Sequence, residues 1–226
     1  MKITKNQCVV EEQNGGRSLT VEISEGVKVN WTSMQNEGKD SLKFVLGAGA
    51  ELKYFSNILG GDADVHIELL GDGARVNSQV VFFGDKEQKM QIQVRHVHKG
   101  RDTHSRMVSK GAVKDKSACE FYGNIQMDSG SEFASADLDE KNLLLSSGAK
   151  IFATPALEVS HHRANSRHSA SFESVDAEKL FYLMARGIGR EDAMRLIVEG
   201  FFADALGAID EGDFREKIFE KISSKI

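Results

Sequence analysis

The chain has 226 residues, and its 29 Lys and Arg against 34 Asp and Glu give a formal net charge of −5 with neutral histidines. Opposite charges are interspersed and form no basic stripe, which argues against a nucleic-acid partner. Hydrophobic residues make up 40% and charged residues 28%, as in a soluble globular protein of one large domain. No apolar run approaches the roughly 18 residues that a membrane-spanning helix needs, so we expect no membrane contact.

The N-terminus and the cysteines predict a cytoplasmic location. Glu11 and Glu12 follow the first residues, where a signal peptide would be apolar. The two cysteines, Cys8 and Cys119, are too few for a disulfide framework and have no Cys-x-x-Cys spacing. We therefore expect reduced thiols.

A degenerate repeat occupies the first two thirds of the chain. It reads apolar, any, any, Gly, usually small, any, apolar, and its clearest copies are residues 23–29, 46–52, 70–76, 127–133 and 145–151. The glycines of these copies, with that of a weaker copy around 111, are Gly26, Gly49, Gly73, Gly111, Gly130 and Gly148. Because glycine adopts positive φ freely and the chain has 21 Gly but only 1 Pro, these positions are interpreted as tight turns.

Short runs of alternating apolar and polar residues lie between the turns, for example at 19–23, 65–69 and 90–94. Alternation predicts strands with one buried face. A strand–turn–strand unit cannot bury that face alone, whereas stacked copies form a continuous interior. The pattern therefore predicts a mainly β protein built as a β-solenoid, and an antiparallel sandwich with Gly-rich hairpins is the alternative.

After about Phe172 the apolar spacing changes from two to three and four. Ser174 or Asp176 is a suitable N-cap for a first helix, which Gly187 and Gly189 would end. A second helix is expected from about residue 191 and a third from about residue 213. The predicted organisation is an N-terminal segment at 1–17, a β-helix core at 18–172 and a helical subdomain at 173–226.

The residues that could carry chemistry are few. The chain has no phosphate-binding loop, dinucleotide fingerprint, nucleophile elbow or His-Glu-x-x-His pair, so it does not resemble an ATPase. His161, His162 and His168 lie within eight residues and could bind a borderline metal, or could lie in an inert polar loop. A second group consists of His96, His98 and His104, which could bind a metal, but a solvated strand face is the favoured interpretation.

Three segments closely resemble the carboxyl-terminal half of the SufB/SufD proteins of SUF iron–sulfur cluster assembly. They are residues 142–158 (NLLLSSGAKIFATPALE), 167–170 (RHSA) and 176–202 (DAEKLFYLMARGIGREDAMRLIVEGFF). The similarity extends from about Gly111 to Leu206, and its LFYLMARGI core is long and specific. The repeats before Gly111 fit only loosely.

The resemblance implies a right-handed parallel β-helix followed by a helical tail, in agreement with the repeat. It also implies a non-enzymatic scaffold. In this family SufB and SufD pair through the ends of their β-helices, and each binds a SufC-type ABC ATPase through its helical tail. Anchors at i, i+3, i+4 and i+7 suit a helix that docks into a groove. On this analogy the ATPase would contact Met194, Ile197, Val198 and Phe201, and packing within the tail is the alternative.

The functional histidine shared by SufB and SufD falls on His168. In SufB a glutamate follows this histidine and a cysteine lies six residues before the proline, whereas this chain has Ser169 and Ala149 there, which leans towards SufD. The candidate ligands of a transient iron–sulfur cluster at a subunit interface are therefore His168, His161, His162 and Glu173, with Cys119 as a weaker thiol candidate.

The expected partners are a SufC-like ATPase and either a second copy of the chain or a SufB/SufD paralogue. A homodimer would bring two His168 side chains together across the two-fold axis. The alternative function is a structural partner of a SufB-like paralogue that holds no cluster itself. A β-helix lyase or acyltransferase is disfavoured, because the repeats are irregular and no secretion signal is recognised.

Overall fold

The computed structural model describes residues 1–226 and contains two parallel sheets of seven strands each. One sheet has the order β1 (Lys2–Ile3), β3 (Arg17–Ile23), β5 (Lys39–Leu46), β7 (Asp62–Leu69), β9 (Lys89–His98), β11 (Ala118–Met127) and β13 (Lys150–Val159). The other has the order β14 (Asn165–Ser174), β12 (Ser135–Leu144), β10 (His104–Val113), β8 (Arg75–Gly84), β6 (Glu51–Ile58), β4 (Lys28–Glu37) and β2 (Gln7–Asn14).

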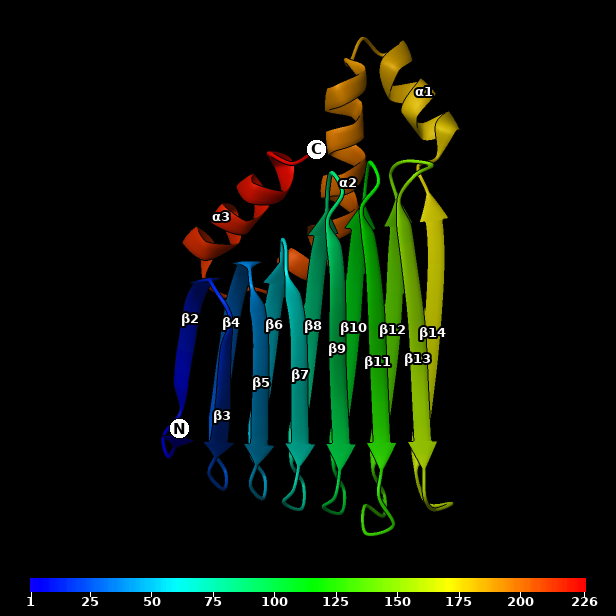
Figure 1. The fold of residues 1–226 in the computed structure, drawn as a ribbon. Helices are drawn as coiled ribbons and strands as arrows, with labels where there is room; N and C mark the ends of the chain where they lie inside the picture. The colour runs from blue at the N-terminus through cyan, green and yellow to red at the C-terminus, as the bar shows by residue number, and fades with distance from the viewer.

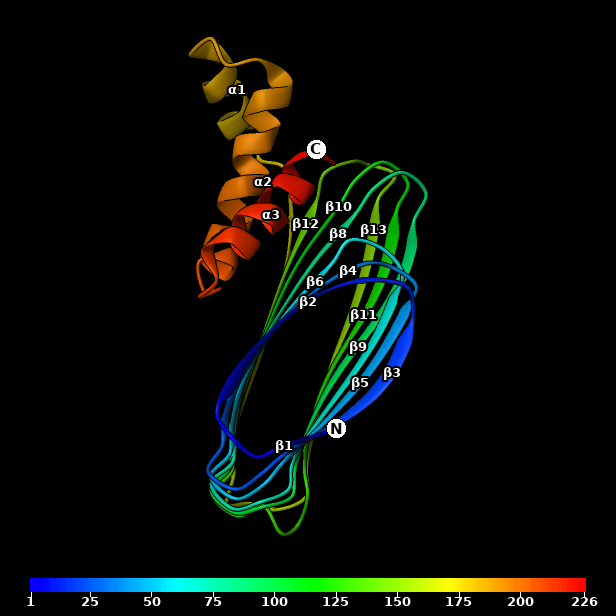
Figure 2. The same cartoon turned by 90° about the vertical axis from the view of Figure 1, so that its left-hand side faces the viewer.

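The chain alternates between these two sheets, so each pair of consecutive strands makes one coil (Figures 1 and 2). Every strand pairs in parallel with the strand two places along the chain, as β10 does with β8 and β12. This confirms the predicted parallel β-solenoid and excludes the antiparallel sandwich. The three predicted strand cores at 19–23, 65–69 and 90–94 lie within β3, β7 and β9.

The coils lengthen along the chain. The residues that occupy equivalent positions are Lys28, Glu51, Arg75, His104, Ser135 and Asn165, so a coil takes 23 or 24 residues at first and 29 to 31 later. The lower turns of the first coils have Gly26, Gly49 and Gly73 at positive φ, as predicted. In the later coils Asp102 and Phe133 take the same conformation, so the glycine signal is lost there.

Gly111 is not a turn residue, contrary to the prediction. It lies within β10 and faces the solenoid interior, where a Cβ atom would lie 1.9 Å from the Phe82 ring. The glycine is needed because the ring occupies the volume that any side chain would take. Phe82 in turn stacks on Phe121, with ring centroids 5.9 Å apart.

We expect Gly111→Ala to destabilise the protein by at least about 2 kcal/mol, since overpacking a dense core forces the ring or the backbone to move. Gly200→Ala is the matched control. Gly200 lies in a helix, and no group outside that helix comes within 4 Å of the point where a Cβ atom would lie, so alanine there should stabilise by up to about 1 kcal/mol. Urea unfolding of both variants measures the effects, and equal stabilities would contradict this packing.

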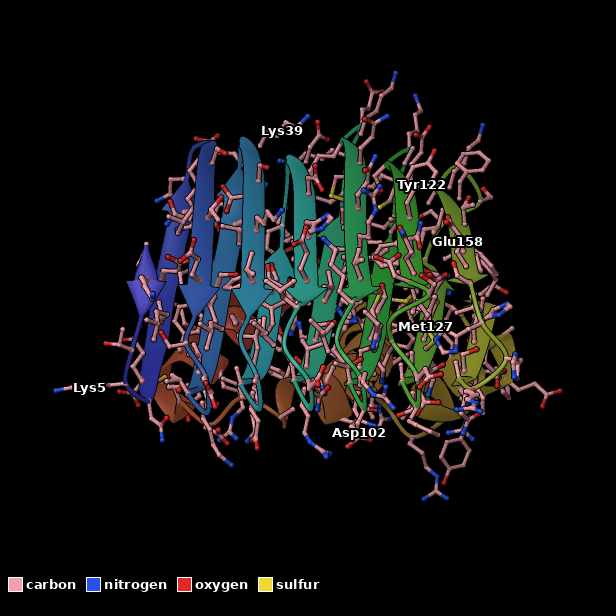
Figure 3. All side chains as sticks on the ribbon, turned by 90° about the horizontal axis from the view of Figure 1, so that it is seen from below. Lys5, Lys39, Asp102, Tyr122, Met127 and Glu158 are labelled. Atoms are coloured by element: carbon pink, nitrogen blue, oxygen red, sulfur yellow. The ribbon has the colours of Figure 1, made fainter.

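The interior between the sheets is a continuous apolar core. Side chains alternate along each strand, one set filling the interior and the other covering the outer faces (Figure 3). A cluster of 35 buried hydrophobic residues runs through the coils and includes Trp31, whose ring meets that of Phe44 edge-on with centroids 5.2 Å apart. This core holds the coils in register.

Residues 2–14 belong to the solenoid, although the sequence predicted a separate segment up to residue 17. β1 pairs with β3, and β2 pairs with β4. The sequence of β2 is too polar to be recognised as a strand. One of its charged side chains is instead paired with lysines of the last helix. Glu12 accepts hydrogen bonds from Lys217 and, at 2.6 Å, from Lys221, which lower the pKa of Glu12 to about 2.

Three helices follow the strands, as predicted: α1 (Ala177–Ala185), α2 (Arg190–Leu206) and α3 (Gly212–Ser223). Asp176 is the N-cap of α1 and accepts hydrogen bonds from the backbone N–H groups of Glu178 and Lys179. Gly187 follows α1 with a φ of 86°. None of the helices is long and apolar enough to cross a membrane.

The helices α2 and α3 cover the outer face of the even-numbered sheet near its upper end (Figures 1 and 2). A second core of 14 buried residues joins Phe83 and Ala112 on the sheet to Val198, Phe202 and Ile218 on the helices. Helix α1 instead packs on α2, beyond the strand ends (Figure 1). The tail is therefore anchored through its last two helices.

Candidate functional site

The last coil of the solenoid is open. Strands β13 and β14 lie at the ends of their sheets, so each has one edge that pairs with no other strand. Phe152 and Val159 on β13 and Phe172 on β14 are exposed, with fractions of 58%, 42% and 51%. An edge with unpaired backbone groups and exposed apolar side chains is suited to pairing with another chain.

His168 lies on β14, within this last coil. It pairs with Leu138 of β12, which is buried in the interior, so His168 belongs to the inward-facing side of β14. The imidazole is nevertheless exposed, because no further coil covers it. The predicted site residue therefore stands at the open end of the interior.

The other predicted ligands do not gather around His168. His161 lies in the turn before β14, where its Nε2 is 3.2 Å from Ser131 Oγ, and His162 is exposed in the same turn. Glu173 lies five residues beyond His168, about 16 Å along the strand at 3.3 Å per residue, and on its opposite face. The structure contains no group of three or more His, Cys, Asp or Glu side chains placed to hold a metal ion.

Cys119 lies on β11 and is fully buried in the core of the solenoid. Burial raises the pKa of its thiol far above the ordinary value, with smaller contributions from Glu120 and Asp62. The group is a neutral thiol that fills space, which is the usual state of a lone buried cysteine.

The histidines of β9 lie in the interior, so the predicted solvated strand face is wrong for them. His98 Nδ1 lies 2.8 Å from Thr103 Oγ1, and its Nε2 lies 2.8 Å from Ser105 Oγ. His96 is fully buried, with Nε2 3.0 Å from Ser78 Oγ. Burial lowers the pKa of His96 to about 3 and that of His98 to about 4. The sequence contained the signal, because both follow the inward phase set by residues 90, 92 and 94.

Sequence reasoning missed Glu140. It faces the interior from β12, only 1% of it is exposed, and neither carboxylate oxygen has a hydrogen-bond partner. Burial, with a smaller contribution from Asp139, raises the pKa of Glu140 to about 7. Its phase relative to the inward-facing Ala136 and Leu138 is the signal that could have found it.

The stripe predicted to meet an ATPase is partly used within the protein. Val198 is fully buried in the second core, Phe201 packs against the same core, and Met194 and Ile197 are half-buried. Lys110 of β10 holds this part of α2 by donating to the Phe201 carbonyl at 2.8 Å and to Asp204.

Four other large apolar side chains are exposed on α1 and α2. The exposed fractions are 73% for Phe181, 57% for Tyr182 and 41% for Met184 on α1, and 48% for Leu196 on α2. We call these four residues the hairpin patch. The Arg186 guanidinium lies over the Tyr182 ring, 5.0 Å from its centroid.

Residues 5–201 match the family described as "SUF system FeS cluster assembly, SufBD core domain". The chain belongs to the SufBD family. Among its relatives, the iron–sulfur cluster assembly protein SufD of Bacillus subtilis is 29% identical over 158 residues, which are 70% of this chain and 36% of that protein.

Two further SufBD family proteins also match this chain over only part of their length. A SufBD family protein of Mycobacterium leprae is 25% identical over 193 residues, covering 80% of this chain and 49% of the relative. One from Staphylococcus saprophyticus is 31% identical over 133 residues, covering 59% and 29%. The chain thus spans less than half the length of these SufBD relatives.

Proposed function

We propose that the protein is a non-enzymatic scaffold subunit for iron–sulfur cluster assembly. The observation that carries this proposal is the family match over residues 5–201, which includes nearly all of the solenoid, α1 and the first part of α2. The relatives are named for iron–sulfur cluster assembly. In this proposal the open end of the solenoid pairs with another SufBD subunit, and the helical tail binds a SufC-type ATPase.

The ATPase contact is proposed for the hairpin patch rather than for the stripe at 194–201. Large aromatic and aliphatic side chains that are exposed on one pair of packed helices favour a protein partner over solvent. Val198 is unavailable for docking because it is buried against the sheet. Phe181 is the central anchor in this proposal, since it is the most exposed of the four.

The pairing contact is proposed for β13 and β14, with a second copy of the chain or a SufB/SufD paralogue as the partner. His168 would then lie at the interface and take part in holding a transient cluster. The second candidate function is a paired subunit that holds no cluster. It is favoured by Ala149 and Ser169 at the family positions and by the burial of Cys119, which leave His168 without a thiolate neighbour from its own chain.

Anaerobic reconstitution with iron and sulfide, in the complex with the ATPase, separates these functions. If this chain holds a cluster through His168, His168→Ala should lose at least half of the bound iron. His66→Ala is the control, because His66 lies on the outer face of β7 beside Glu68. Unchanged iron content in His168→Ala would support the cluster-free subunit, and the mass of the complex identifies self-pairing or mixed pairing.

A further inference from the structure

Three polar side chains on neighbouring positions of β10 and β12 face the interior of the solenoid, one coil below its open end. Ser109 of β10 and Glu140 of β12 are neighbours in register, and Asn142 lies two residues beyond Glu140 on the same side of β12. Their exposed fractions are 1%, 1% and 2%. The strand above them is β14, with Ala170 next to Glu140.

These three groups have no partners. Both oxygens of Glu140, the hydroxyl of Ser109 and the amide nitrogen of Asn142 are buried without a hydrogen bond. Buried polar groups in native proteins are almost always paired, and an unpaired carboxylate is costlier than a neutral group. A water molecule could satisfy the hydroxyl and the amide, but only a proton or a cation compensates the carboxylate charge.

The backbone makes room for this carboxyl group. Gly123 of β11 faces Glu140 across the interior, and a Cβ atom there would lie 2.6 Å from Glu140 Oε1. Glycine inside a strand often marks a close approach by another group. A side chain at 123 would fill the space that the carboxyl group now occupies.

We propose that Glu140, with Ser109 and Asn142, binds one divalent cation that prefers oxygen ligands, such as Mn²⁺ or Fe²⁺. Glu140 would supply the charge, Ser109 its hydroxyl oxygen, and Asn142 its amide oxygen after rotation of the amide. Burial raises the pKa of Glu140, so the carboxyl group holds its proton to higher pH and a bound cation would displace that proton. The site lies one coil inside the strand that carries His168.

The proposed cation site does not depend on the proposed scaffold function. The identification of iron(II) as its natural ion does depend on that function. In that case the ion would be cargo held inside the scaffold, next to the surface where a partner chain pairs. The site uses none of the side chains that the resemblance implied.

Binding of Mn²⁺ alone to the full chain tests the site, with free Mn²⁺ measured by electron paramagnetic resonance. We expect one ion per chain, and we expect the dissociation constant to be at least 10-fold higher for Glu140→Gln than for the parent. Ser109→Ala should weaken binding by a smaller factor. Glu87→Gln is the matched control, because the Glu87 side chain is 79% exposed on the surface, and the variant should bind Mn²⁺ like the parent.

Absence of Mn²⁺ binding up to millimolar concentration, or equal binding by Glu140→Gln and the parent, would overturn the proposal. Loss of binding through misfolding is separable, because removing a buried charge should leave Glu140→Gln at least as stable as the parent, and its thermal midpoint shows this. The assay contains no sulfide and no ATPase, so its failure would leave the scaffold function to be decided by reconstitution.

Discussion

Phe181→Asp should weaken binding of a SufC-type ATPase by at least about 100-fold without destabilising the protein. A central aromatic anchor commonly contributes about 2 kcal/mol or more to binding, and a buried aspartate at the interface adds a desolvation cost. The folded monomer should tolerate the change, because 73% of Phe181 is already in water. Isothermal titration with the ATPase and a thermal scan measure the two effects.

Two control variants locate the contact. Phe152→Asp places the same charge on β13, at a residue that is 58% exposed on the odd-numbered sheet, whereas the helices pack on the even-numbered sheet, so ATPase binding should be unchanged. Val198→Asp introduces a charge into the core between α2 and the sheet, so the thermal midpoint should fall along with binding. If Phe181→Asp binds as tightly as the parent, the hairpin patch is not the docking surface.

Most of the fold could be predicted from local patterns. The three helices were found because Asp176 caps the first and glycines follow it, and because apolar spacing continues at three and four in the others. The early turns were found because a short coil of 23 or 24 residues needs a glycine at each tight bend. Beyond β8 the longer coils accept Asp102 and Phe133 at positive φ, which no composition rule anticipates.

The site was harder to predict, because it depends on which coil is last. His168, Leu138 and Met107 have the same inward phase on successive strands, yet only His168 is exposed. In sequence analysis, polar residues are expected to face solvent. For this reason His96 was predicted on a solvated face, and Glu140 was not considered. In both cases strand phase pointed inward, and phase is the more reliable signal in a solenoid because every strand has one face in the interior.

The sequence also could not show how much of the predicted docking stripe the protein itself covers. Helical periodicity identifies an apolar face, but it does not say whether the protein or a partner covers that face. The face of α2 that contains Val198 and Phe202 covers the sheet, where Phe83 and Ala112 offer an apolar surface. Among the helices, α1 carries the largest number of exposed apolar residues, and the sequence does not indicate that α1 packs on α2 rather than on the sheet.

Glu140→Gln should raise the free energy of unfolding at pH 8 by about 3 kcal/mol in metal-free protein. The folded-state pKa of Glu140 is about 7, against an ordinary value of 4.5, and each unit of difference is about 1.4 kcal/mol. A raised carboxyl pKa means that the folded state resists ionisation. Its stability is therefore full below pH 4.5 and declines as the pH rises, until the whole loss is present above pH 7. Glutamine never ionises, so the variant escapes this loss.

The comparison between parent and variant is needed because other groups titrate in the same range. His96 and His98 have folded-state pKa values of about 3 and 4, so below pH 6.5 protonation of the unfolded chain lowers stability in both proteins. Subtracting the two stability curves removes that contribution. Urea unfolding at intervals from pH 4.5 to 8 should give a difference near zero at the acid end that grows steadily towards pH 8. A difference that stays constant across this range would mean that Glu140 has an ordinary pKa in the folded protein.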